Sequence, residues 1–240
     1  MEDNGLRPLN RYITTHDENG VTGFQTQTPE LLQWQQLANG ARFSLGYATN
    51  ETPVDLSDDK DLDIYQSYLS DLPGITIPGG TVLRVVDMNP GSISPMHRTV
   101  SLDYGVVLEG EVEMILDSGE KRLLKRGDIA VQRGTNHAWR NPSSTTWARM
   151  LYVLQEAKPI QVGGKPLEED YGGGMDDVKP NLFFDPKTST GSVKSERPGR
   201  FNNRPFFQRQ TKPTEEERRD VRTSNPIRND IRSGAEGESV

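Results

Sequence analysis

Two of the three histidines of this 240-residue chain lie within one stretch, between Gly91 and Asn141. His97 and His137 each stand inside alternating apolar sequence and close to a glycine-marked turn. Imidazole changes its charge near neutral pH, and it is a frequent nitrogen ligand of metal ions. Two histidines brought together from separate strands can therefore build a metal site or an acid–base site.

The sequence around these histidines predicts a series of short strands. The β-rich runs fall at residues 104–108, 112–116, 121–124, 129–132 and 147–154. Turn sequences containing glycine separate most of them, as hairpins require. Short strands at such even spacing are typical of an antiparallel barrel or sandwich.

The spacing of glycine, histidine and acidic residues resembles the two sequence motifs of the cupin family. The first motif is followed by Gly91, His97, Thr99, Asp103 and Gly110. The second is followed by Gly127, Asp128, Gly134, His137 and Asn141. The amino-acid sequence in and around these motifs is also similar to that of one-domain cupins from bacteria and fungal secondary-metabolite clusters. The resemblance implies an all-β fold, the cupin double-stranded β-helix or jelly-roll barrel.

The chain departs from the cupin pattern at two positions. Thr99 stands where the motif has its second histidine, and Asp103 stands where it has glutamate. What remains is His97, Asp103 and His137, which has the composition of a 2-His-1-carboxylate site for non-haem Fe(II). Losing one of four usual ligands either opens the coordination sphere or marks a site that has lost its metal. The expected cofactor is a divalent ion, Fe(II) with Mn, Ni or Zn as alternatives, and no nucleotide.

Each of these residues also has a plainer interpretation. Gln132 could add an amide oxygen to the metal, or its amide could pair with the backbone of its strand. Asp103 could orient His97 instead of binding metal. His97 could bond to the backbone of a turn, and His137 could be an ordinary core histidine. Asn141 is expected to close a turn.

Alternation along the flanking strands predicts which side chains could contact a substrate. Arg84 and Met88 share one face of the strand that precedes the first motif. Facing inward, Arg84 would offer a planar fork of donors to a carboxylate or phenolate, whereas facing outward it would be a surface residue. Trp139, Met150 and Tyr152 either suit a flat apolar substrate or fill an ordinary barrel core.

Composition divides the chain into three parts. Residues 1–79 are expected to form an arm of short strands with an acidic loop, and residues 80–156 the cupin barrel core. Residues 157–240, rich in Pro, Gly and Arg, are expected to be a flexible, largely disordered tail with docking segments. Within the arm, residues 29–37 predict one or two turns of helix and residues 51–70 a solvated loop.

The bulk composition argues against several classes of protein. A net charge of −7 does not suit a nucleic-acid surface, which needs clustered Lys and Arg. The chain has no cysteine, so it forms neither disulfides nor thiolate metal sites. The first residues contain no apolar run typical of a signal sequence or membrane span. We therefore expect a soluble, cytoplasmic protein, and the resemblance implies a homodimer.

Three functions fit these features. The first is a metal-dependent oxidoreductase or oxygenase that acts on an aromatic or polyketide-type intermediate of secondary metabolism. The second is a lyase or isomerase that uses histidine and Asp103 for acid–base decarboxylation or dehydration. The third is a cupin that binds a small ligand without turning it over. The sequence contains no DNA-binding module through which a sensed ligand could act, which favours an enzyme.

Overall fold

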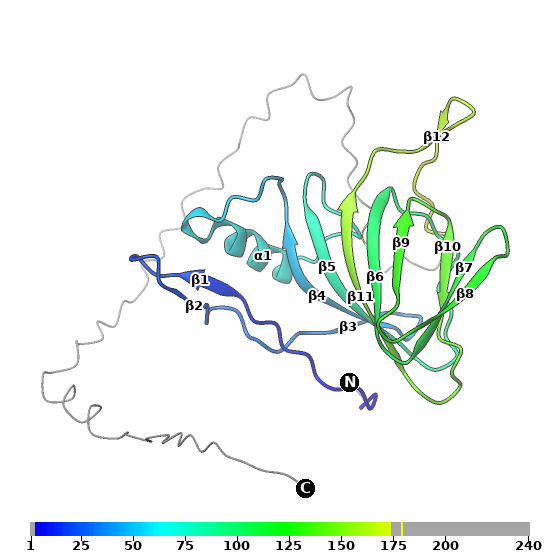
Figure 1. The fold of residues 1–240 in the computed structure, drawn as a ribbon, viewed down its shortest axis with the longest axis horizontal. Helices are drawn as coiled ribbons and strands as arrows, with labels where there is room; N and C mark the ends of the chain where they lie inside the picture. Colours follow the sequence, from blue (N-terminus) through cyan, green and yellow to red (C-terminus); the bar gives the residue numbers. More distant parts are fainter. Residues whose placement is uncertain (1–2, 174–178, 180–240) are drawn as a thin grey trace, which may run out of the picture. The chain divides into compact units, whose positions relative to one another are not determined.

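The computed structural model describes residues 3–173 and Lys179 (Figure 1). Most of the predicted tail, residues 157–240, lies outside these described residues. The one α-helix of the described part is α1, Lys60–Ser70, which follows a short 3-10 turn at Ser57–Asp59. The strands are β1 Thr14–His16, β2 Thr22–Phe24, β3 Gln35–Gln36, β4 Arg42–Thr49, β5 Thr81–Met88, β6 Ser101–Glu109, β7 Glu111–Leu116, β8 Lys121–Lys125, β9 Ile129–Arg133, β10 His137–Arg140, β11 Ala148–Glu156, β12 Gln161–Val162 and β13 Lys165–Pro166.

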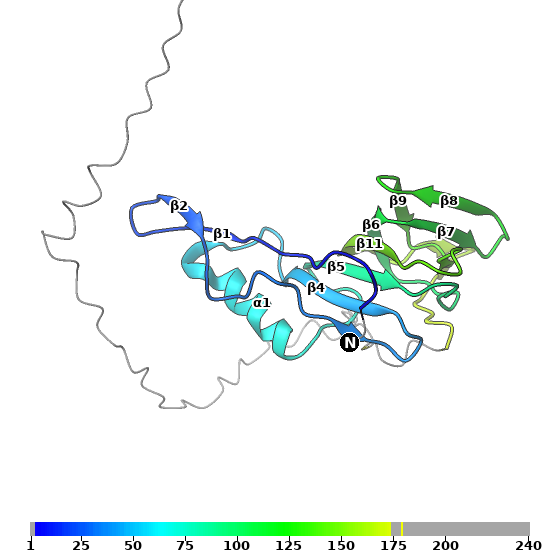
Figure 2. The same cartoon turned by 90° about the horizontal axis from the view of Figure 1, so that it is seen from below.

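Two antiparallel sheets form the barrel. The larger has the order β3-β4-β5-β11-β6-β9, and the smaller has the order β10-β7-β8. In Figures 1 and 2, α1 lies at the β4 end of the large sheet, and β7 and β8 lie at its other end. One buried cluster joins the sheets: it contains Val86 and Met150 from the large sheet and Val112, Leu124 and Trp139 from the small one. The fold is thus the all-β barrel that the sequence predicts.

The N-terminal arm is partly built into the barrel. Strand β4 pairs with β5 along its whole length and so becomes an inner strand of the large sheet. The first part of the predicted tail also returns to the barrel, because Arg98 and Asp170 exchange two backbone hydrogen bonds of 2.6 and 2.9 Å. Described residues on both sides of residues 80–156 therefore pair with the barrel.

The arm corrects two predictions of local structure. Residues 29–37 are extended rather than helical, because β3 pairs with Arg42 and Phe43 of β4. The acidic stretch contains α1, which buries Leu62 and Tyr65. The Tyr65 hydroxyl donates a hydrogen bond of 2.9 Å to the Leu45 carbonyl. Acidic residues in the first turn of a helix stabilise it through the helix dipole, so the charges that suggested a loop also suit a helix.

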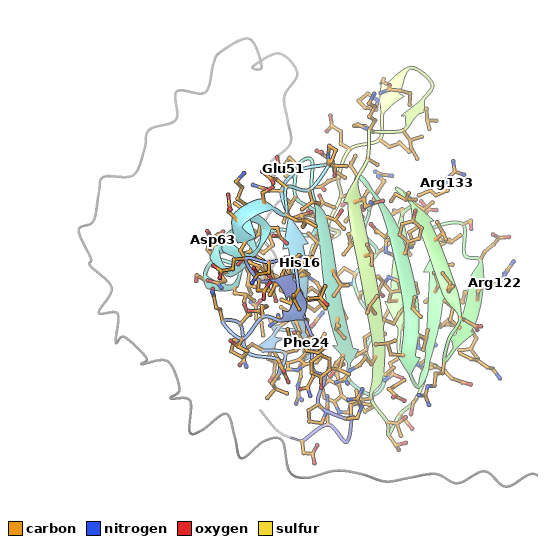
Figure 3. The ribbon with its side chains drawn as sticks, turned by 60° about the vertical axis from the view of Figure 1, so that its left-hand side comes forward. His16, Phe24, Glu51, Asp63, Arg122 and Arg133 are labelled. Atoms are coloured by element: carbon orange, nitrogen blue, oxygen red, sulfur yellow. The ribbon has the colours of Figure 1, made fainter. Side chains whose placement is uncertain are left out.

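Several other charged side chains lie at the surface. Arg122 on β8 and Arg133 on β9 are exposed and lie on the opposite side of the view from Asp63 of α1 (Figure 3). The third histidine, His16, is exposed at the end of β1. No helix in the described part of the chain is long and apolar enough to span a membrane. The homodimer stays a prediction.

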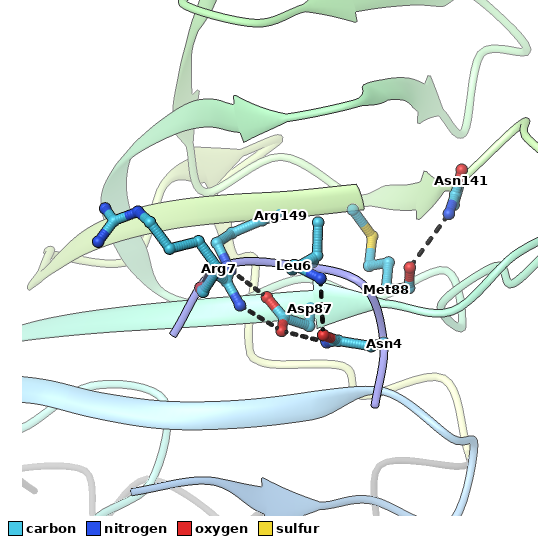
Figure 4. A network of polar contacts seen from close by, with 7 residues as sticks. All are labelled: Asn4, Leu6, Arg7, Asp87, Met88, Asn141 and Arg149. Carbon is cyan, nitrogen blue, oxygen red and sulfur yellow. Dashed lines mark hydrogen bonds and ion pairs between the residues drawn. The ribbon is translucent and has the colours of Figure 1, made fainter. Parts of the chain in front are cut away.

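A buried ion pair fixes the arm to the barrel (Figure 4). Arg149 of β11 binds both carboxylate oxygens of Asp87 on β5, at 2.5 and 2.7 Å. Its Nη1 donates to the Arg7 carbonyl at 2.6 Å, while Asn4 donates to Asp87 at 2.8 Å. The Arg149 guanidinium also lies 5.0 Å from the centre of the Trp34 ring. Two segments of the arm thus depend on one charge pair between neighbouring strands.

Removing the charge of Asp87 should destabilise the fold strongly. Asp87→Asn keeps the shape of the side chain but leaves the Arg149 charge buried without its partner. We expect a loss of about 3–5 kcal/mol in the free energy of unfolding, measured by urea denaturation. Glu111→Gln is the control, because the Lys125–Glu111 pair is exposed and 3.8 Å long; its effect should stay within about 0.5 kcal/mol. Equal effects of the two substitutions would contradict the assignment.

Candidate functional site

A cavity of about 110 Å³ opens between the two sheets. All but one of the side chains that the sequence predicts for the site line it: Arg84, Met88, His97, Asp103, Gln132, His137, Trp139 and Tyr152. The exception is Met150, which is completely buried in the adjoining core. Its sulfur accepts a hydrogen bond of 3.0 Å from the Tyr152 hydroxyl. Met150 therefore contacts Tyr152 from the core and is not among the residues that line the cavity.

The two histidines are neighbours because their backbones pair. His97 and His137 form an isolated antiparallel bridge, with two N–H···O bonds of 2.9 Å each. Residues opposite each other in such a pair project their side chains to the same face. The centres of the imidazole rings are accordingly 4.2 Å apart.

Backbone carbonyls determine which ring nitrogen carries the proton. Nδ1 of His97 lies 2.8 Å from the Pro95 oxygen, and Nδ1 of His137 lies 2.8 Å from the Thr135 oxygen. A carbonyl oxygen can only accept, so both Nδ1 atoms carry hydrogen and both Nε2 atoms keep a free lone pair. Burial lowers the pKa of His97, and burial together with the nearby His97 lowers the pKa of His137 to about 3. Both rings are thus neutral at pH 7.

Asp103 and Gln132 face the cavity from opposite positions on β6 and β9. Burial raises the pKa of Asp103 to about 6, although hydrogen bonds from Ser101 and Thr99 act in the other direction. Its Oδ2 accepts a long hydrogen bond of 3.5 Å from Thr99, and its buried Oδ1 has no hydrogen-bond partner within the described chain. The Pro95 carbonyl, rather than Asp103, orients His97.

The histidine pair provides two suitable ligands for a divalent metal ion. Metal-binding histidines use one ring nitrogen and donate the other N–H to an oxygen, which is the arrangement seen here. Among the described residues, however, no three His, Cys, Asp or Glu side chains are grouped so as to hold an ion. Asp103 is thus not grouped with the histidine pair in this structure, and its role as a metal ligand stays a prediction. The residues fit an ion held by two imidazoles that takes its other ligands from water or substrate.

Arg84 faces inward, which decides between the two orientations that the sequence left open. It lines the cavity from β5 and lies opposite Tyr152 on β11. The Tyr152 ring meets Trp139 edge to face at 5.7 Å between ring centres, and Trp139 meets His137 at 5.8 Å. An aromatic wall thus runs from the neighbourhood of Arg84 to the histidines.

Several lining residues were missed by the sequence analysis. They come mainly from the arm and from the segment before His97: Leu37, Asn39, Ala41, Phe43, Ile75, Ser92, Ile93, Ser94 and Pro95. The alternating strand that contains Phe43 was the only signal for them. Gly105 was missed as well. A Cβ at this position would lie 3.0 Å from Tyr152 and 3.2 Å from Met150, so the glycine leaves room for the Tyr152 ring.

Asn141 has the structural role that its position suggests. Its Nδ2 lies within hydrogen-bond distance of the carbonyls of Met88, Asn89 and Thr146, at 3.1, 3.2 and 2.8 Å. Its Oδ1 accepts from the Ser143 N–H at 3.0 Å. Figure 4 shows the contact between Asn141 and Met88. The side chain closes the turn after β10 and ties it to the end of β5, beside the cavity wall.

Comparison with known proteins agrees with this architecture. A family model described as "Cupin domain" matches residues 84–154. The chain is 56% identical over 175 residues to "Phomopsin biosynthesis cluster protein C'" of Diaporthe leptostromiformis, covering 73% of this chain and 93% of that protein. It is 40% identical over 168 residues to "Cupin-domain-containing oxidoreductase srdB" of Neurospora crassa, covering 70% of this chain and 84% of the relative.

This chain therefore belongs to the cupin family, and its relatives include proteins of fungal secondary-metabolite clusters. Among solved structures, it is similar to the cupin domain of a transcriptional regulator from Enterobacter cloacae. That likeness has 27% identity and a TM-score of 0.29, and it covers 32% of this chain and 83% of the other.

Restoring the motif histidine should strengthen metal binding. Thr99 lines the cavity, and its hydroxyl bonds to the Ser101 hydroxyl at 2.6 Å. Thr99→His would add a third imidazole to the site, and we expect Co(II) affinity to rise on the order of tenfold or more, measured by titration. Thr99→Val is the matched control, because it also removes the hydroxyl but adds no ligand. Equal affinity of both variants would contradict a metal position beside the histidine pair.

Proposed function

We propose that this cupin is a small-molecule oxidoreductase in which His97 and His137 hold a divalent metal ion, with Fe(II) as the first choice. Its substrate would be an aromatic or polyketide-type intermediate of secondary metabolism. One observation carries the proposal: two imidazoles that line the cavity have ring centres 4.2 Å apart, and each has its Nδ1 against a backbone carbonyl, which leaves Nε2 as the nitrogen for a ligand bond. Relatives named as cupin-domain-containing oxidoreductases support the reaction class.

The chain's own residues would divide the work as follows. When bound, the ion would supply redox or Lewis-acid chemistry. His97 and His137 would hold it, and the Pro95 and Thr135 carbonyls would keep their rings in place. The aromatic wall would orient a flat substrate and exclude water. Asp103, which faces the cavity from β6, would accept a proton from the substrate or release one to it, since its buried Oδ1 has no hydrogen-bond partner within the described chain.

A second candidate is a lyase or isomerase without redox chemistry. It is favoured by the separation of Asp103 from the histidine pair, because a buried carboxyl group outside the metal position can serve as an acid–base group. In that case the two neutral imidazoles would act as hydrogen-bond acceptors or bases. Turnover that survives complete removal of metal by a chelator would favour this second function.

The metal content of purified variants tests the proposal. Fe(II) would be supplied anaerobically, with Mn(II), Ni(II) and Zn(II) in parallel, and bound metal measured by elemental analysis. We expect near-stoichiometric metal in the wild type and its loss in His97→Ala and His137→Ala, because each removes one of two imidazole ligands. His16→Ala is the matched control, since this third histidine is exposed on β1. Retention of metal by both cavity variants, or no metal in the wild type, would overturn the proposal.

Asp103→Asn separates the roles within the site. Because Asp103 does not group with the two histidines, this variant should keep metal at the wild-type level. Its activity should fall if the carboxyl group transfers a proton. Loss of the metal in the Asp103→Asn variant would show instead that the carboxylate is a ligand.

A further inference from the structure

Arg84 is a buried cation that has no carboxylate partner among the residues that the structure describes. Only 7% of the residue is exposed. Both of its hydrogen bonds come from Nη2, which donates to the carbonyls of Gly74 at 3.1 Å and Pro73 at 3.4 Å. The guanidinium lies over the Phe43 ring, 5.2 Å from its centre. Within the described chain, no acidic side chain forms an ion pair with Arg84, so its charge is balanced only by dipoles and an aromatic face.

Arg149 shows how the same fold treats a buried arginine whose role is structural. It is 3% exposed, and it binds Asp87 through two nitrogens and the Arg7 carbonyl through the third. Leaving a buried charge without such a partner is costly. Arg84 is different from Arg149 in one further respect, since it lines the cavity that contains the histidines. Among the described residues, Arg84 thus differs from Arg149 both in its partners and in its access to the cavity.

Asp103 is the acidic side chain that lines the cavity within the described part of the chain, and it forms no ion pair with Arg84 there. Arg84 on β5 lies opposite Tyr152 on β11, and Asp103 on β6 lies opposite Leu154 on β11. The Cα atoms of Arg84 and Asp103 are thus about 10 Å apart across the strands and about 7 Å apart along them, and neither group is among the causes that shift the pKa of the other. Burial lowers the pKa of Arg84 to about 10, with the Tyr171 phenol acting in the opposite direction, so the guanidinium remains charged at neutral pH.

We propose that the substrate carries a carboxylate that binds Arg84 and an apolar ring that lies along Trp139 and Tyr152. This inference rests on the proposed function, in that it assumes an organic substrate in the histidine cavity. A guanidinium offers a planar set of N–H donors that matches a carboxylate. The aromatic wall leads from the Arg84 end toward the histidines. The substrate is therefore an aromatic or similarly flat acid, held by its carboxylate at the end away from the metal-binding pair.

Benzoate and benzamide are suitable probes, because they have nearly the same shape and differ in charge. Binding to the full-length, chelator-treated protein would be measured by calorimetry at pH 7.5. We expect benzoate to bind the wild type at least about tenfold more tightly than benzamide. Arg84→Met should weaken benzoate binding on the order of 10- to 100-fold and leave benzamide binding nearly unchanged. Arg122→Met, at an exposed position on β8, is the control and should change neither.

Two results would overturn the inference. One is equal affinity of the wild type for benzoate and benzamide, which needs no variant. The other is an unchanged preference for benzoate in Arg84→Met protein with a normal melting transition. If Arg84→Met fails to fold, Arg84→Lys replaces it. Lysine keeps the positive charge but lacks the planar set of N–H donors of the guanidinium. Benzoate affinity should therefore fall, while benzoate should still bind more tightly than benzamide.

The outcome is separable from that of the metal proposal. Metal-free His137→Ala protein should still prefer benzoate, because Arg84 is intact. If benzoate binds only when metal is present and only when His137 is intact, the carboxylate binds the ion, and the inference about Arg84 fails while the proposed function stands. If no metal binds but the preference for benzoate depends on Arg84, the oxidoreductase proposal fails and the carboxylate site stands.

Discussion

The site depends on the backbone bridge between His97 and His137. Two hydrogen bonds of 2.9 Å join the segment before β6, which belongs to the large sheet, to the first residue of β10 in the small sheet. The same pairing that closes this part of the barrel therefore sets the separation of the two imidazoles. Each ring is then oriented by the carbonyl two residues earlier in its own segment. Fold and site share these few backbone interactions, so neither can change without the other.

Buried charge is used in two ways in this barrel. On one face of β5, Asp87 neutralises Arg149 and anchors the arm, so the charge serves the fold. On the other face, Arg84 points into the cavity and is held by carbonyls and the Phe43 ring. Alternation along one strand thus separates a structural ion pair from a cation available to a ligand. The arm contributes to both faces, because it supplies partners for Asp87 and also Phe43.

Much of this could be predicted from the sequence, because the spacings reflect local geometry. The turn glycines and the alternation of strands predicted the barrel, and the alternation of β5 placed Arg84 and Met88 on one face. Alternation does not show, however, whether an inward-facing side chain lines the cavity or is buried in the core. Met150 and Tyr152 are two residues apart on β11 and so share one face of the strand. Met150 nevertheless lies in the buried core, where it packs beside Gly105 and Tyr152. Motif spacing likewise placed Asp103 on the correct wall but could not show that it stands apart from the histidine pair. Helix α1 was missed because its acidic composition suits both a loop and a helix whose tyrosine is buried by tertiary contacts.

The tautomeric state of the two cavity histidines tests the account most directly. Long-range proton–nitrogen correlation spectra of the metal-free, full-length protein at pH 7 would distinguish the ring nitrogens, with the His16→Ala spectrum identifying the exposed histidine. We expect His97 and His137 both to be neutral, with hydrogen on Nδ1 and a free Nε2. A proton on Nε2 of either ring, or a doubly protonated ring, would contradict the arrangement on which metal binding at this site rests.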